Sequence, residues 1–206
     1  MEDVLDLYAE PYDPARPVIC FDEHPYQLTS DVLEPMPMKP GRSKREDYEY
    51  ERIGVCNVFI FFQPLTGWRF VIVRETRKRP DFAICMKTLA DEWFPQAHQI
   101  RVVLDQLNTH TPGSFYEAFE ACEAKRLTEK LEFHYTPTHG SWLNMAEIEL
   151  SVLSRHHLKR RIPTVNELQE VSFSWASKRT EHKAIIDWRF FTKSAREKFR
   201  KFYFNP

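Results

Sequence analysis

Two apolar runs of this chain each end in an aspartate, and a third acidic residue lies in a segment with helical character. Asp22 closes V-I-C-F-D, Asp105 closes I-R-V-V-L-D, and Glu147 lies within H-G-S-W-L-N-M-A-E. Short continuous apolar runs are typical of strands buried on both faces of a sheet. A fold that buries both runs must therefore place the two aspartates at strand ends, at the edge of its core.

The order of the predicted elements defines the fold class. Strands are predicted at residues 17–23, 55–62, 68–74, 100–104 and 131–135, and helices at 81–94, 114–124, 142–158, 164–178 and 194–203. Residues 26–29 could pair back on the first strand or form a loop. Q-P-L-T-G joins the second and third strands as a hairpin, and the later strands alternate with helices, which favours parallel pairing.

This order is that of a ribonuclease-H-like domain, an α/β fold with a mixed five-stranded sheet flanked by helices. Residues 1–206 are predicted to form one such domain, with a long loop at about 31–51 and a C-terminal helical extension at about 164–206. In this sheet the first and fourth strands are neighbours, which would bring Asp22 and Asp105 together. Glu147 would reach them from the helix predicted at 142–158.

Composition agrees with a single globular domain in the cytoplasm. The chain has 206 residues, 42% of them hydrophobic and 14% aromatic, which is enough to bury a core. A formal charge of −1 gives no overall basic field, so any contact with nucleic acid must come from local patches. The four cysteines form no C-x-x-C pair and are expected to be reduced core thiols. No signal peptide or membrane span is expected.

Three converging carboxylates suit hard divalent cations such as Mg²⁺, and two such ions can drive in-line displacement at a phosphodiester. Each acid also has a structural interpretation. Asp22 could cap a turn in D-E-H-P, Asp105 could form an Asx turn, and Glu147 could complete a capping box with Asn144. Glu149 competes with Glu147, from which it is rotated by about 200° on a helix. Periodicity leaves that choice open.

The segments V-I-C-F-D-E, V-V-L-D-Q-L-N-T-H and H-Y-T-P-T-H-G-S-W-L-N-M-A-E, followed by D-W-R-F-F-T, resemble the Asp-Asp-Glu (DDE) catalytic domain of bacterial insertion-sequence transposases of the mariner superfamily. The family pattern N-x-x-E favours Glu147 over Glu149 and implies Asp22 and Asp105 as the other metal ligands. The family often has asparagine where this chain has Gln106, and 41 residues separate Asp105 from Glu147. This spacing is longer than in the best-known eukaryotic branch of the superfamily.

The resemblance implies cleavage of DNA strands at transposon ends and transfer of the 3′-hydroxyls to target DNA, typically at TA. It implies two Mg²⁺ ions, with Mn²⁺ able to substitute, and a homodimer on double-stranded DNA. Because the first strand begins at about residue 18, an N-terminal helix-turn-helix for end recognition is not expected. Either an excised catalytic domain or the product of a second reading frame would explain this.

Two basic clusters are predicted to contact DNA, although a solvated charged face is the alternative for each. They comprise Lys39, Arg42, Lys44 and Arg45 in the long loop, and Lys159, Arg160 and Arg161 after the third predicted helix. The histidines near the acids match no zinc pattern. Instead, His110 is expected to orient the loop after Asp105, and His139 with Gly140 to shape a turn.

Two other functions fit the same scaffold. One is a different ribonuclease-H-like nuclease, which would not join a 3′-hydroxyl end to target DNA. The other is a non-catalytic DNA-binding regulator derived from a transposase, against which the intact acidic trio argues.

Overall fold

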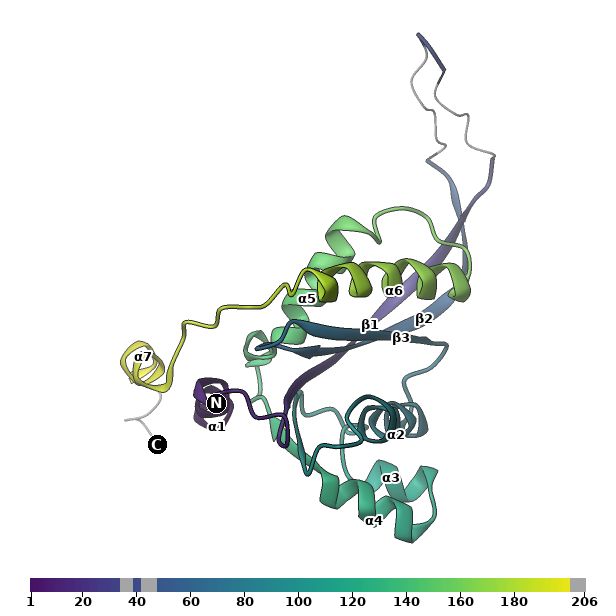
Figure 1. Cartoon of the computed structure of the whole chain (residues 1–206). Helices are drawn as coiled ribbons and strands as arrows, with labels where there is room; N and C mark the ends of the chain where they lie inside the picture. The colour runs from purple at the N-terminus through teal and green to yellow at the C-terminus, as the bar shows by residue number, and fades with distance from the viewer. Residues whose placement is uncertain (34–38, 42–47, 201–206) are drawn as a thin grey trace.

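The computed structural model describes residues 1–33, 39–41 and 48–200, and within them a five-stranded mixed sheet forms the centre of the molecule (Figure 1). The strands are β1 (Val18–Asp31), β2 (Tyr50–Gln63), β3 (Trp68–Arg74), β4 (Ile100–Leu104) and β5 (Leu131–Tyr135). Their order in the sheet is β3-β2-β1-β4-β5. The pairs β1–β2 and β2–β3 are antiparallel, whereas β1–β4 and β4–β5 are parallel. The predicted fold class and the adjacency of the first and fourth strands are confirmed.

Side chains alternate between the two faces of the sheet and build two separate apolar cores. One core contains Val18, Cys20, Ile60 and Val103, and the other contains Ile19, Phe21, Phe59, Phe61 and Val102. Because successive strand residues point to opposite faces, an uninterrupted apolar run such as 18–21 fills both cores. Each face then needs a layer of helices to cover it.

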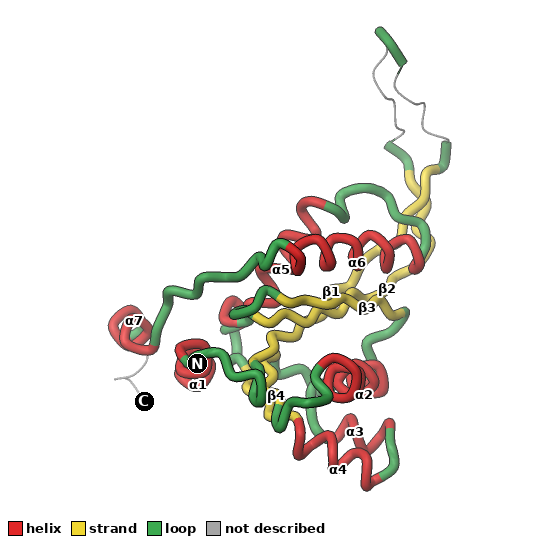
Figure 2. Tube along the Cα trace, in the orientation of Figure 1, coloured by secondary structure: helices red, strands yellow, loops and turns green. Residues whose placement is uncertain are grey.

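Helices cover both faces (Figures 1 and 2). One layer comprises α5 (Met145–His156) and α6 (Val165–Glu181); the other comprises α2 (Arg79–Thr88), α3 (Gly113–Ala118) and α4 (Ala121–Lys130). A π-helical turn, η1 (Leu89–Trp93), extends α2, and a 3₁₀ turn, η2 (Ser141–Leu143), precedes α5. Beside the sheet, α1 (Glu2–Ala9) packs on α7 (Thr192–Lys198).

The first strand is longer than predicted. β1 continues through residues 26–29 to Asp31, paired with β2, so the D-E-H-P turn does not form and Pro25 lies opposite Asn57. β4 pairs with β1 only from Val18 to Cys20. Beyond that point one side of β1 has no strand partner among the described residues, and such an edge accepts a proline that cannot donate a hydrogen bond.

Several helix boundaries also differ from the prediction. The helix expected at 114–124 is divided because Phe119 is extended and Glu120 is also not helical. The helix expected at 142–158 begins only at Met145, since Asn144 is its extended N-cap. The N-terminal helix α1 was not expected, and the helix predicted at 194–203 runs partly outside the described residues.

The cysteine prediction holds for three of the four thiols. Cys20, Cys56 and Cys85 are buried, whereas Cys122 is exposed on α4, so it is not a core thiol. In the described part of the chain, no helix is both long enough and apolar enough to cross a membrane.

Candidate active site

The parallel register of β1 and β4 brings the first two acids to neighbouring strand ends. Cys20 and Val103 form the last pair of this ladder. Continuing the same offset for two residues places Asp22 opposite Asp105. Asp22 also follows Val18 and Cys20 on the sheet face covered by α5, because alternate residues share a face.

The third acid is brought to the same place by the N-cap of α5. The Asn144 side-chain oxygen accepts a hydrogen bond from the Ala146 N–H at 3.1 Å. Its amide nitrogen donates to the carbonyl oxygen of Phe21 at 2.7 Å, and Asn144 is 1% exposed. One side chain therefore caps the helix that carries Glu147 and ties its first turn to the residue before Asp22.

A tight turn leads the chain into this helix. His139 adopts the left-handed conformation with φ 62°, and the Gly140 N–H donates to the carbonyl oxygen of Pro137 at 2.7 Å. A Cβ atom at Gly140 would lie 2.6 Å from the Pro137 Cγ atom, so the turn requires glycine there. The prediction that His139 and Gly140 shape this turn is confirmed. From α1, the Tyr8 hydroxyl donates to the Leu143 carbonyl at 2.9 Å.

The acids influence one another electrostatically. Burial raises the pKa of Asp22 from 3.8 to about 7; a hydrogen bond from the Glu23 N–H lowers it, and the negative charges of Glu23, Asp105 and Glu147 raise it. The Glu23 N–H lies 2.8 Å from the Asp22 Oδ1 atom. A buried carboxylate with anionic neighbours is stabilised in its charged form by a cation.

The structure separates Glu147 from its competitor. Glu149 is fully buried, and its carboxylate pairs with the Arg69 Nε at 2.9 Å and with the Arg179 Nη2 at 2.8 Å. The Arg179 Nε donates to the same carboxylate at 3.0 Å. Because this network joins α5 to β3 and α6, both Glu149 oxygens are engaged away from the aspartates. Glu147, on the opposite side of the helix, is the acid whose charge acts on Asp22.

Glu23 and His110 form a contact that the sequence does not predict. The His110 Nε2 lies 2.9 Å from the Glu23 Oε2, and its Nδ1 lies 2.6 Å from the Asp105 Oδ1. Burial would lower the pKa of His110, but the hydrogen bonds to Asp105 and Glu23 outweigh it and raise this pKa to about 9. The sequence holds one clue to this contact: side chains alternate along a strand, so Glu23 points to the face of the sheet opposite Asp22.

Comparison with known proteins identifies the family. A protein-family model described as "DDE superfamily endonuclease" matches residues 17–169. The chain belongs to this family. Comparison with curated proteins gave no match.

Solved structures similar to this DDE endonuclease domain include several Mos1 transposase complexes. The "Mos1 transposase paired-end complex with left transposon end" has a TM-score of 0.54 at 12% identity, over 81% of this chain and 51% of that chain. The "Mos1 mariner paired end complex with Mn" gives 0.52 at 13% identity, over 88% and 57%. The similarity supports the ribonuclease-H-like fold. This DDE endonuclease domain spans about half the length of those chains.

The donor set of the acidic trio fits a hard divalent cation. Asp22, Asp105 and Glu147 supply only carboxylate oxygens, which Mg²⁺ prefers, and the Asp105 side chain is 34% exposed. Among the described residues, no three His, Cys, Asp or Glu side chains are already arranged to hold a metal ion. One Asp105 oxygen faces His110, so the second Asp105 oxygen is the one that could bind a cation, and the Asp22 and Glu147 carboxylates would have to turn toward it.

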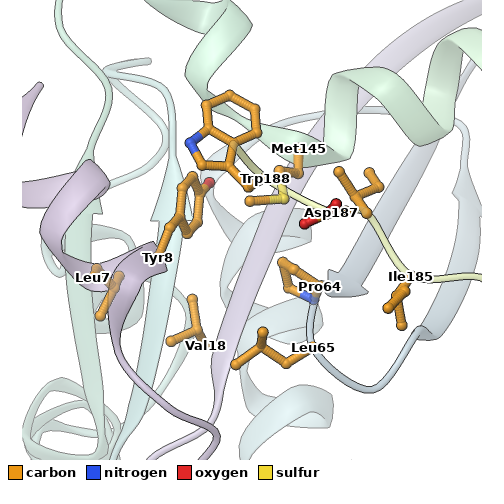
Figure 3. A pocket seen from close by; sticks show the side chains of 10 residues that line it. Leu7, Tyr8, Val18, Pro64, Leu65, Met145, Ile185, Asp187 and Trp188 are labelled. Carbon is orange, nitrogen blue, oxygen red and sulfur yellow. The ribbon is translucent and has the colours of Figure 1, made fainter. Parts of the chain in front are cut away.

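A separate cavity of about 170 Å³ lies between α1, the β2–β3 turn, the start of α5 and the segment after α6 (Figure 3). Its lining is mainly apolar and includes Leu7, Tyr8, Pro64 and Met145, to which Asp187 adds a charged side chain. The acidic trio does not line this cavity. It therefore belongs to the packing of α1 and of the C-terminal segment around the entry to α5.

The predicted basic residues lie in different settings in this DDE endonuclease. Lys39 and Lys159 are exposed. Arg160 pairs with Glu167 at 2.9 Å, while Arg161 forms an ion pair with Asp31 at the end of β1. Arg42, Lys44 and Arg45 lie outside the described residues.

Proposed function

We propose that this chain is the catalytic domain of a mariner-superfamily transposase from a bacterial insertion sequence. It would cleave DNA strands at transposon ends and join the resulting 3′-hydroxyls to target DNA. The proposal is supported by the register of β1 and β4, which directs Asp22 and Asp105 to neighbouring strand ends, and by the link from Asn144 to Phe21, which directs the start of α5 toward them. Membership of the DDE endonuclease family supports the same reaction class.

Asp22, Asp105 and Glu147 are the proposed ligands of two Mg²⁺ ions, for which Mn²⁺ can substitute. When bound, these ions would neutralise charge on the entering and leaving oxygens of a phosphodiester. The chain itself provides three carboxylates from separate elements and a buried asparagine that fixes the carrier helix. One of the similar structures is a Mos1 mariner paired end complex with Mn, which is consistent with this metal class.

The proposed partner is double-stranded DNA, bound partly by a basic groove between the end of α5 and α6. This groove, of about 400 Å³, is lined by His156, His157, Arg160 and Lys178 together with Glu170 and apolar or small residues. The groove lies at the opposite end of α5 from Glu147. Its cationic side chains could therefore bind the phosphates of a DNA duplex that extends away from the acidic trio. Lys39, Arg42, Lys44, Arg45, Lys159 and Arg161 remain proposed contacts.

Two copies of the chain are proposed to act together on paired DNA ends. The similar Mos1 structures include a paired-end complex and a strand transfer complex, which supports this arrangement. Light scattering with and without an end duplex would test it, and a single copy on each DNA complex would contradict it.

The direct test is a plasmid assay that follows both nicking and joining of a pre-cleaved 3′-hydroxyl duplex, with Mg²⁺ or Mn²⁺. We expect metal-dependent products that Asp105→Asn and Glu147→Gln both abolish. Joining would distinguish a transposase from another ribonuclease-H-like nuclease, which would cut without joining. DNA binding without metal-dependent chemistry would instead favour the non-catalytic regulator.

A further inference from the structure

His110 lies between two carboxylates that come from neighbouring strands. Its Nδ1 is 2.6 Å from the Asp105 Oδ1, and its Nε2 is 2.9 Å from the Glu23 Oε2. The His110 side chain is 1% exposed and that of Glu23 is 2% exposed. Both carboxylates are within ion-pair distance of the ring, and the Nδ1 also lies 3.4 Å from the backbone carbonyl oxygen of Asp105.

The surroundings of His110 hold its ring in one orientation. Phe21 packs edge-on against it with ring centroids 5.3 Å apart, and Phe82 lies tilted at 4.9 Å. The Tyr135 hydroxyl donates to the His110 carbonyl at 2.7 Å, and the His110 N–H donates to the Leu107 carbonyl at 3.0 Å. A ring held in this way cannot follow Asp105 if that carboxylate swings, so the ring restrains the carboxylate.

We propose that His110 is a positioning residue for Asp105 and that Glu23 in turn holds His110. The ring, through its ion-pair contact with the Asp105 Oδ1, holds one Asp105 oxygen and leaves the other to turn toward Asp22. Glu23 keeps the second ring nitrogen engaged from the opposite face of β1. Hydrogen-bond partners of metal ligands typically contribute 10-fold to 100-fold to metal affinity or activity. This inference rests on the proposed function, since it needs Asp105 to be a metal ligand.

The experiment measures Mn²⁺ binding by the intact chain, using the electron paramagnetic resonance signal of free Mn²⁺, with circular dichroism to check folding. His110→Ala is expected to raise the dissociation constant at least 10-fold. His110→Asn, whose amide can still donate to Asp105, should recover most of that loss, and Glu23→Gln should fall between them. His134→Asn is the matched control, because the His134 Nδ1 also contacts a carboxylate, that of Asp3 at 2.9 Å, outside the acidic trio.

A cleavage assay at varied Mn²⁺ adds a readout that a purely structural role would not produce. The variants should need more Mn²⁺ for half-maximal rate but approach the wild-type kcat at saturation. Folded His110→Ala that binds Mn²⁺ with wild-type affinity would overturn the inference. If His110→Ala does not fold, wild-type affinity in Glu23→Gln and His110→Asn, with no increase in the Mn²⁺ needed for cleavage, would overturn it equally.

Asp105→Asn separates this inference from the proposed function. If the wild type binds no Mn²⁺, or if Asp105→Asn binds it unchanged, the metal site itself is wrong and the inference falls with it. If Asp105→Asn loses binding but the His110 and Glu23 variants do not, only the positioning role is wrong.

Discussion

Replacing Glu149 with glutamine should destabilise the fold without removing a metal ligand. Its carboxylate pairs with Arg69 at 2.9 Å, and both side chains are 0% exposed. The substitution leaves the Arg69 guanidinium buried without its counter-charge. Burial already lowers the pKa of Arg69 from 12.5 to about 10, although the charge of Glu149 opposes this shift.

The size of the loss follows from the burial of each partner. Breaking a fully buried ion pair costs about 3–5 kcal/mol, and glutamine can still accept one hydrogen bond, which favours the lower figure. Arg179 is 30% exposed, so its share is screened and adds little. We expect about 3 kcal/mol, which in a domain of this size corresponds to a fall in melting temperature of roughly 6–12 °C.

The assay is urea and thermal unfolding followed by circular dichroism, with Mn²⁺ binding measured on the same samples. Glu147→Gln is the matched control, since the described residues give Glu147 no ion pair; it should unfold within about 1 kcal/mol of the wild type but lose Mn²⁺ binding. Arg69→Gln combined with Glu149→Gln should cost less than the sum of the single changes. If Glu149→Gln kept wild-type stability and lost Mn²⁺ binding, Glu149 would be the ligand and the rotation assigned to α5 would be wrong.

Three further outcomes are expected. Asn144→Ala should cost about 2–4 kcal/mol in urea unfolding, because it removes a helix cap and leaves the Phe21 carbonyl unpaired; Asn144→Ser, which can still cap the helix but cannot reach Phe21 with an amide, should cost less, and equal losses would contradict the double role. The pKa of Asp22 is raised to about 7, so the metal-free fold binds more protons than the unfolded chain and loses stability as pH rises from 3.8 to 7. Asp22→Asn should therefore raise the melting temperature more at pH 8 than at pH 5, and an equal gain at both would refute this. Lys178→Gln in the basic groove should reduce the slope of log affinity for DNA against log salt by about 1, and an unchanged slope would exclude that phosphate contact.

The sequence predicted three strands to the residue because local pattern and tertiary environment agree there. β3, β4 and β5 have the predicted bounds, and each is a short run rich in β-branched, aromatic or leucine side chains with a turn or helix at its ends. β1 was predicted too short because Pro25 indicates a turn when read locally. Only the sheet order reveals that this proline lies on a part of β1 that β4 does not reach.

The sequence suggests the residues of the candidate site, but it does not suggest the contacts that support them. Strand ends and the N-x-x-E spacing indicated Asp22, Asp105 and Glu147, and the N-cap role of Asn144 was readable from the same four residues. The contact of Asn144 with Phe21 joins residues that are far apart in sequence, as does the contact between His110 and Glu23. No local pattern encodes such pairs, because they exist only once the parallel strands and α5 have been assembled.

The two glutamates of α5 show how a buried network can orient a neighbouring acidic residue. Glu147 and Glu149 are chemically identical and two positions apart, so neither propensity nor charge selects one. The rotation of α5 about its axis decides which of the two acids faces Asp22. Two restraints set this rotation: Asn144 ties the start of the helix to β1, and Glu149 ties its other side to Arg69 and Arg179. Because Glu149 is committed to this network, Glu147 is left as the acid of α5 whose charge acts on Asp22. Under the proposed function, Glu149 would therefore select the third metal ligand without binding the metal itself.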